Sequence, residues 1–270
     1  MAENKDLNTL AETYNTDKLE HGYIKIYEKY FESERNKQLK ILEIGIADGK
    51  SLLMWSDYFK NSTVVGIDTH KIDIKEKNLN RSNIKIHQGS QSDDKFINTI
   101  IKEYENFDII IDDGSHLKKD VIKSFHLLFP HLNNEGLYVV EDMQTSYNHF
   151  FGGNPFDLKY SNSHMNFFKH LTDRLIYQEI ANPFYISNKY DAKLTTISFY
   201  HNFIFVRKGV NDKLSKEVIN HSYEDMKFNE KSSRTGNSFK YYLKYKIFYK
   251  IYTFIFMILT YIKKLLLLRF

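Results

Sequence analysis

Two short acidic clusters follow apolar runs that are expected to form buried strands. They consist of Asp112, Asp113 and His116 after residues 107–111, and of Glu141 and Asp142 after residues 137–140. Carboxylate oxygens are the ligands that Mg²⁺ prefers, with Mn²⁺ as an alternative, and the chain has no cysteine to favour Zn²⁺. A histidine beside such an ion is a candidate general base. The pattern therefore indicates an enzyme, although acids at these positions can also cap helices or remain solvated in loops.

The elements around these clusters predict a strand, helix, strand unit. The runs 107–111 and 137–140 are continuously apolar, as in a parallel sheet covered on both faces. Between them, residues 117–132 have helical apolar spacing that Pro130 stops, and residues 133–136 are expected to turn. Neighbouring strands lie roughly 5 Å apart, and ligands of open α/β sheets bind beyond the carboxyl ends of the strands. The acids of both clusters are thus expected to meet at one ion.

A glycine loop follows an earlier apolar strand at residues 41–44. Gly45 and Gly49 enclose three residues, and a helix is expected to begin near Ser51. Glycine permits close approach of the backbone to a ligand, and a helix start offers unpaired N–H groups. A dinucleotide site would read G-x-G-x-x-G. The spacing here, with Glu43 two residues before the first glycine, resembles instead the first motif of class I S-adenosylmethionine-dependent methyltransferases.

Two further strand ends carry polar side chains. The apolar run 63–67 ends at Asp68, which is well placed to accept hydrogen bonds from two ribose hydroxyls, although nicotinamide enzymes use an acid there too. The run 84–87 leads into the polar loop 88–93, which is expected to hold the edge of an adenine ring. The order of these features at three successive strand ends indicates a nucleoside-containing cofactor.

Residues 10 to 209 resemble the metal-dependent sugar O-methyltransferases of the mycinamicin type, and more widely polysaccharide-modifying and cephalosporin hydroxylase-like bacterial proteins. The matching stretches are residues 14–18, 21–23, 45–49, 89–93, 112–116 and 137–142. The resemblance implies a Rossmann-like α/β fold, with a mostly parallel seven-stranded sheet that ends in an antiparallel hairpin. It also implies that Asp113, Glu141 and Asp142 hold Mg²⁺ and that His116 is the general base.

The cofactors predicted in this way are S-adenosylmethionine and Mg²⁺. The predicted cofactor-binding residues are Lys18, Glu43, Gly45, Gly49, Ser51, Asp68, Ser90, Gln91, Asp93 and Asp112. A bound divalent ion lowers the pKa of a hydroxyl, and the histidine then takes the proton as the oxygen attacks the methyl carbon. Residues 143–160 are expected to form a loop over the acceptor, with Gln144, Tyr147 and His149 on its sugar hydroxyls.

The acceptor expected first is a sugar from capsular or lipopolysaccharide synthesis, with a nucleotide-linked sugar as one form. A macrolide or other secondary metabolite is the first alternative, because the chemistry is equivalent. A nicotinamide oxidoreductase is disfavoured by the glycine spacing. A non-enzymatic membrane adaptor is disfavoured because it would not need the metal ligands and the histidine together. The sequence does not decide between a monomer and a homo-oligomer.

Charge and composition divide the chain of 270 residues. Residues 231–270 contain nine Lys or Arg and no acid, against 29 basic and 34 acidic residues before them. We expect an N-terminal helical segment (1–36), a catalytic domain (37–210), a linker (211–238) and a basic, aromatic helical tail (239–270). The uncharged run 251–262 is shorter than the roughly 20 residues of a bilayer span. The tail is therefore expected to lie on the inner face of the membrane or on protein, and its uncharged run disfavours nucleic acid. The polar N-terminus predicts a cytoplasmic protein.

Overall fold

The computed structural model describes residues 5–73, 77–160, 162–180 and 185–212, together with the single residues Ile251, Ile255 and Ile258. The chain divides into two compact units, residues 1–213 and 214–270. In the second unit the three described isoleucines have helical backbone and are exposed. The rest of the expected tail and nearly all of the expected linker lie outside the described residues. No helix of the described part is long and apolar enough to cross a membrane.

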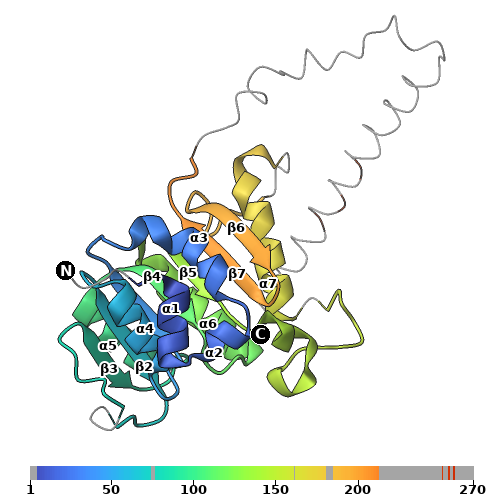
Figure 1. The fold of residues 1–270 in the computed structure, drawn as a ribbon. Coiled ribbons are helices and arrows are strands. Elements are labelled where there is room, and N and C mark those ends of the chain that lie inside the picture. Colours follow the sequence, from blue (N-terminus) through green and yellow to red (C-terminus); the bar gives the residue numbers. More distant parts are fainter. Residues whose placement is uncertain are drawn as a thin grey trace, which may run out of the picture. The chain divides into compact units, whose positions relative to one another are not determined.

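The first unit is built on one seven-stranded sheet in the order β3-β2-β1-β4-β5-β7-β6 (Figure 1). The strands are β1 (Lys40–Ile44), β2 (Thr63–Asp68), β3 (Ile84–Gln88), β4 (Phe107–Asp112), β5 (Leu132–Val140), β6 (Leu194–Tyr200) and β7 (Phe203–Lys208). Strands β1 to β5 are parallel, whereas β7 is antiparallel to both β5 and β6. The predicted sheet and its antiparallel final hairpin are confirmed.

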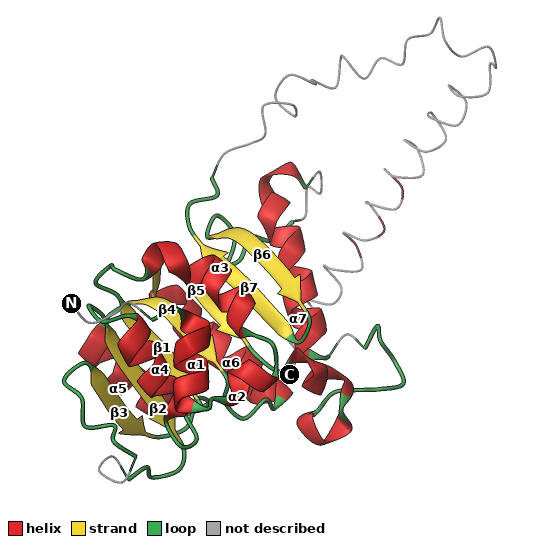
Figure 2. Cartoon of the chain, in the orientation of Figure 1, coloured by secondary structure: helices red, strands yellow, loops and turns green. Residues whose placement is uncertain are grey.

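Helices cover both faces of this sheet, as Figure 2 shows in red against the yellow strands. The α-helices are α1 (Leu7–Tyr14), α2 (Asp17–Glu20), α3 (Ile24–Phe31), α4 (Lys50–Tyr58), α5 (Asp94–Tyr104), α6 (Lys118–Leu128) and α7 (His164–Leu171). The 3₁₀ helices are η1 (Glu32–Glu34), η2 (Phe129–His131), η3 (Met143–Tyr147), η4 (His149–Phe151) and η5 (Thr172–Glu179). Helices α1, α3 and α4 pack on one face, and α5, α6 and α7 pack on the other.

Successive side chains along each strand point to opposite faces of the sheet and so pack into the two hydrophobic cores, one on each face. In β1, Ile41 packs with α1, α3 and α4, whereas Leu42 and Ile44 pack with α5 and α6. Both sets are buried, so the strand reads as continuously apolar. Burial of each such aliphatic side chain stabilises the fold by about 1.5–3 kcal/mol. The continuous runs therefore place the strands, and the strands place the polar residues that follow them.

Two local expectations were wrong. The expected turn at residues 133–136 lies inside β5, where Glu135 has a φ of 65° and the pairing with β4 shifts register between Phe107 and Ile109. A register irregularity of this kind accommodates polar residues without ending the strand. The expected loop at residues 143–160 begins with η3 and η4, because Thr145 and His149 carbonyls accept 3₁₀-type backbone hydrogen bonds.

Candidate active site

The two acidic clusters meet at the carboxyl ends of β4 and β5. The pairing of these strands sets Asp112 opposite Val140, and the Glu141 N–H donates to the Asp112 carbonyl at 3.0 Å. Asp142, the next residue, has left-handed backbone (φ 55°, ψ 41°), which turns the chain sharply out of the strand. The predicted convergence of the clusters is therefore present in the structure.

Asp113, His116 and Asp142 form the part of this cluster that fits a metal ion. One possible ligand atom from each lies within 4.8 Å of the other two. His116 Nε2 is 3.6 Å from Asp142 Oδ2 and 4.0 Å from Asp113 Oδ1. The three side chains are 16–21% exposed, so they border solvent. Two carboxylates with an imidazole beside them suit a hard ion such as Mg²⁺ or Mn²⁺.

Glu141, the third predicted metal ligand, faces inward. Its side chain is 1% exposed, and its Oε1 atom accepts from Lys18 Nζ at 2.7 Å and from the Tyr27 hydroxyl. Burial and the neighbouring Asp113 carboxylate raise the pKa of Glu141 well above its usual value. Glu141 is therefore adjacent to the three-residue cluster but is engaged by the N-terminal segment.

Lys18 was predicted to contact the cofactor, but its ammonium group lies among the acids. Lys18 Nζ is 2.7 Å from Asp113 Oδ2, 2.7 Å from Glu141 Oε1 and 3.5 Å from Glu43 Oε1, with the side chain 1% exposed. Burial alone would lower the pKa of Lys18, yet the three carboxylates hold that pKa well above its usual value. The lysine stays charged in the interior because its counter-ions are buried with it.

Two tyrosines of the N-terminal segment also bind the acids. Tyr23 donates to Asp142 Oδ1 at 2.7 Å, and Tyr27 donates to Glu141. They lie four residues apart at α3, so both hydroxyls point to the same side of the helix. Tyr27 was not among the residues that the sequence predicted for the site. The signal that could have found it is the i, i+4 repeat of a half-polar aromatic side chain next to the Lys18 motif.

The glycine loop and the end of β2 form the neighbouring half of the site. Gly45 and Gly49 both have left-handed backbone, with φ of 78° and 80°. Asp68 Oδ2 accepts from the backbone N–H groups of Ile46 and Ala47 at 3.0 and 3.1 Å, and Asp68 Oδ1 accepts from the N–H of His70 at 2.8 Å. Burial would raise the pKa of Asp68, but these three hydrogen bonds outweigh it and hold the pKa below its usual value.

Besides Lys18, four of the predicted cofactor residues are buried and bonded to each other or to the core. Glu43 accepts from the Ser51 hydroxyl at 2.8 Å and from the Trp55 indole at 3.2 Å. Gln91 donates to Asp112 at 2.9 Å and accepts from the N–H of Ser115 at 2.8 Å. Asp112 also accepts from Ser124 and Tyr138, and burial raises its pKa to about 6. These hydrogen bonds connect the strand ends to each other and to α4 and α6 in the interior.

The polar loop after β3 borders an open hollow of about 580 Å³. Its lining residues are Ser90, Ser92, Asp93, Asp94, Lys95 and Lys123. Asp93 caps α5 by accepting from the N–H groups of Lys95 and Phe96, at 2.8 and 3.3 Å. Ser90 and Asp93, both predicted to be cofactor-binding, are thus brought together at the third strand end.

The predicted acceptor residues lie on the segment that leaves Asp142. Gln144 and His149 are exposed and Tyr147 is half-buried. The segment is anchored by the Thr145 hydroxyl, which donates to the Asp142 carbonyl at 2.7 Å, and by the Asn154 N–H, which donates to the Ser146 carbonyl at 3.2 Å. It therefore stays beside the acid cluster, and the ring of Phe151 lies 6.3 Å from that of His116.

Comparison with known proteins gives a consistent family. Residues 42–143 match a family model described as a methyltransferase domain. This chain contains a methyltransferase domain. Over 218 residues, or 77% of the chain, it is 35% identical to mycinamicin VI 2''-O-methyltransferase of Micromonospora griseorubida and 36% identical to demethylmacrocin O-methyltransferase of Streptomyces fradiae.

A solved structure agrees with the sequence match. The MycE methyltransferase of the mycinamycin pathway, in complex with Mg and SAH, is 33% identical and superimposes with a TM-score of 0.75. The match covers 83% of this chain and 60% of that one. This chain spans about half the length of the two curated relatives, because the match covers 54% of each of them.

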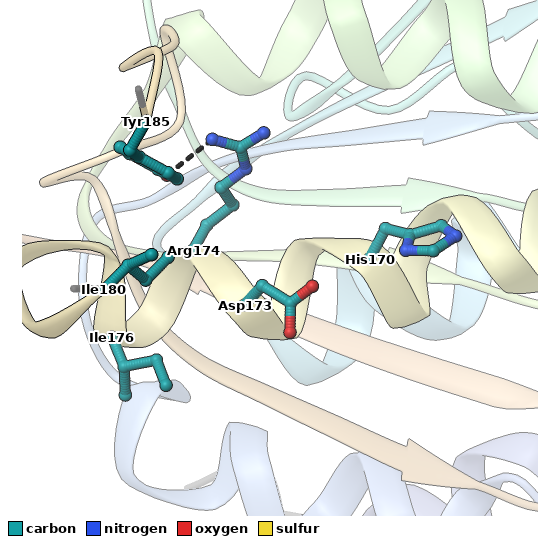
Figure 3. Close-up of a pocket in the computed structure, with 6 residues that line it drawn as sticks. All are labelled: His170, Asp173, Arg174, Ile176, Ile180 and Tyr185. Carbon is teal, nitrogen blue, oxygen red and sulfur yellow. Dashed lines mark hydrogen bonds between the residues drawn. The ribbon is translucent and has the colours of Figure 1, made fainter. Parts of the chain in front are cut away.

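A second hollow, of about 510 Å³, lies away from the predicted site residues and outside the matched residues 42–143. It is lined by His170, Asp173, Arg174, Ile176, Ile180 and Tyr185 (Figure 3). Arg174 donates to the Tyr185 hydroxyl and lies 3.5 Å from Asp191, so its charge is already paired. None of the residues predicted for cofactor, metal or acceptor belongs to this hollow.

Proposed function

We propose that the methyltransferase domain transfers a methyl group from S-adenosylmethionine to a sugar hydroxyl in a Mg²⁺-dependent reaction. The observation that carries this proposal is the cluster of Asp113, His116 and Asp142, which lies beside a glycine loop of methyltransferase type. Relatives with sugar O-methyltransferase names and a solved relative with Mg and SAH support it.

The residues of the cluster take distinct roles in this proposal. Asp113 and Asp142 would hold the ion, with the buried Glu141 next to them. Mg²⁺ at this site would lower the pKa of the acceptor hydroxyl. His116 Nε2, which is 3.6 Å from Asp142 and 4.0 Å from Asp113, would stay unbound by the ion and accept the hydroxyl proton. The acceptor oxygen then forms a bond to the methyl carbon as the sulfur–carbon bond breaks, and the proton remains on His116.

The cofactor would bind across the ends of β1, β2 and β3. The Asp68 carboxylate has lone pairs left to accept from hydroxyl groups of the cofactor, and the hollow beside Ser90 suits its adenine edge. The Asp68 carboxylate already holds the glycine loop by accepting from the N–H groups of Ile46 and Ala47. The loop therefore has its conformation before a ligand binds. A preformed site avoids the entropic cost of ordering the loop on binding.

For the acceptor, we infer a sugar attached to an apolar body of the macrolide type. The capsular or lipopolysaccharide role has no support among the relatives, whose names favour the macrolide alternative. The segment beside the acid cluster also exposes Phe150, Phe156 and Leu158, which are 78%, 96% and 66% exposed. Exposed apolar side chains beside the site suit a sugar attached to an uncharged, apolar molecule better than a sugar attached to a nucleotide diphosphate. The cytoplasmic location and the membrane contact of residues 239–270 stay predictions from the sequence.

The first test is binding by calorimetry, with S-adenosylmethionine and NAD titrated separately into the full chain. Selective binding of S-adenosylmethionine is expected, and binding of NAD alone would overturn the proposal. The second test measures methyl transfer to glycosylated macrolides and to nucleotide-linked sugars, with Mg²⁺ or with a chelator. Transfer to the macrolides that the chelator abolishes is expected. Transfer to nucleotide-linked sugars alone would retain the reaction but reject the acceptor class.

A further inference from the structure

Lys18 is a buried cation surrounded by the acids of the proposed metal site. An ammonium group has three N–H donors and no acceptor. In Lys18 two of these donors face Asp113 Oδ2 and Glu141 Oε1 at 2.7 Å, and Glu43 Oε1 follows at 3.5 Å. Two donors are therefore committed to carboxylates of the protein, and the charge is shared with a third carboxylate. With its side chain 1% exposed, Lys18 is placed for these acids rather than for the cofactor contact that the sequence predicted.

The contacts of Lys18 divide the two oxygens of Asp113. Oδ2 accepts from Lys18, whereas Oδ1 faces His116 Nε2 at 4.0 Å, on the side of the three-residue cluster. A carboxylate with one oxygen fixed cannot rotate freely, so its second oxygen keeps its direction. Glu141 is held in the same way through Oε1, by Lys18 and Tyr27 together.

The charge of Lys18 affects both the repulsion among the acids and the binding of a metal ion. Asp113, Glu141 and Glu43 are close enough to share one ammonium group, and Asp142 lies beside them. Without a cation, the repulsion of these buried carboxylates would be costly. With a divalent ion present, the ammonium group instead repels that ion. Lys18 thus stabilises the site before the ion binds and opposes the ion afterwards.

We propose that Lys18 is a positioning residue of the metal centre, which orients Asp113 and Glu141 and limits the affinity for Mg²⁺. This inference rests on the proposed function, because it requires that the acid cluster binds the ion. It assigns to α2, outside the matched methyltransferase model at residues 42–143, a direct part in setting the metal site.

The test is Lys18→Met in the full chain, with thermal unfolding followed in a chelator and across a Mg²⁺ titration. In the chelator the variant is expected to melt at a lower temperature than the wild type. Added Mg²⁺ should then raise its melting temperature by more than in the wild type, with an apparent affinity for Mg²⁺ tighter by roughly tenfold. The affinity for S-adenosylmethionine should remain within about twofold, since no donor of Lys18 is assigned to it.

Lys37→Met is the matched control, because Lys37 is 57% exposed and pairs with Glu34 on the surface. It should change neither the melting temperature in the chelator nor the response to Mg²⁺. Lys18→Gln provides a second variant that keeps a hydrogen-bond donor without the charge, and it should show the same stronger response. If both Lys18 variants fail to fold even at saturating Mg²⁺, the inference is wrong, because the ion should replace the lost charge.

The outcomes separate this inference from the proposed function. No response of the wild type to Mg²⁺ would remove the metal centre and the proposed function with it. A wild-type response that Lys18→Met merely equals or weakens would reject only the limiting role of Lys18. A large loss of S-adenosylmethionine affinity in Lys18→Met, with the Mg²⁺ response unchanged, would restore the cofactor contact and reject the positioning role.

Discussion

The two halves of the candidate site use different parts of the chain. At the ends of β1 and β2, the Asp68 carboxylate accepts from two N–H groups of the glycine loop, whose Gly45 and Gly49 have left-handed backbone. At the ends of β4 and β5, side chains from several elements converge, and Asp113 keeps one oxygen directed at His116. The cofactor half therefore depends on backbone shape, whereas the acid half depends on side-chain charge. Substitutions should affect the two halves differently.

The sharpest test of this difference is Asp142→Asn. Removing one charge from the proposed metal site should lower Mg²⁺-dependent methyl transfer by on the order of 10³-fold, because metal ions supply several kcal/mol of stabilisation in such reactions. Affinity for S-adenosylmethionine should change little. Glu34→Gln, on the surface beside Lys37, is the control and should retain full activity. Equal loss of cofactor binding in Asp142→Asn would show that the halves are not separate.

His116→Ala should have the next largest effect. If His116 is the general base, turnover should fall by about 10²- to 10⁴-fold while cofactor affinity persists. Steady-state kinetics with the calorimetric affinity would check this. His170→Ala changes an exposed histidine outside the acid cluster and should leave turnover unchanged. Near-normal turnover of His116→Ala would remove it from the role of base.

Gly45→Ala tests the point where the two halves touch. A Cβ atom at Gly45 would lie 2.1 Å from the carbonyl oxygen of Asp113, and the φ of 78° is unfavourable for alanine. We expect a loss of about 3–4 kcal/mol in the free energy of unfolding, measured with denaturant, and weaker binding of both S-adenosylmethionine and Mg²⁺.

Gly22→Ala is a matched control for that variant. Gly22 has a φ of 72°, but a Cβ atom there would meet no atom of the described part of the chain within 4 Å. It should cost only the backbone strain, about 1 kcal/mol, and leave both affinities intact. If Gly45→Ala cost no more than Gly22→Ala, the close approach between the halves would be irrelevant to stability.

Much of the fold followed from the sequence because apolar runs identify buried parallel strands. The meeting of Asp113, His116 and Asp142 followed as well, since their strands are neighbours in the sheet. The inward direction of Glu43 was available from strand alternation, as it shares the parity of Ile41 and so faces the layer of α4. Glu43 was instead assigned to the cofactor because of its distance in sequence from Gly45, without regard to the face of the strand on which it lies.

The place of Lys18 could not be predicted in this way. It depends on how α1 and α3 pack on the sheet through residues such as Leu10, Tyr27 and Phe31. No periodicity in the sequence specifies which strand end a short helix will reach. The same holds for η3 and η4, whose hydrogen bonds are local but whose position beside the cluster is set by the backbone of Asp142.

The smallest predicted effect concerns His164, which lies outside both halves. Burial lowers its pKa to about 4, and its Nδ1 atom has no hydrogen-bond partner among the residues that the structure describes. Since the unfolded chain binds the proton more tightly, stability is full above about pH 6.5 and falls as the pH drops towards 4, by about 2–3 kcal/mol. His164→Gln should lose less stability over this interval in denaturant titrations. An identical pH dependence in the variant would assign the acid sensitivity to other groups.

The hydrogen bond between Lys18 and Glu141 joins residues 123 positions apart. At about 5–20 residues per second, a ribosome needs on the order of ten seconds to make the chain between them. During that time Lys18 is in water, and the apolar faces of α1 and α3 have no sheet to cover. Helices α1 and α3 are therefore made before the strands that they cover and are among the last parts to be completed. This delay predicts that nascent chains engage chaperones through α1 and α3, and that release from them coincides with the pairing of β4 with β5.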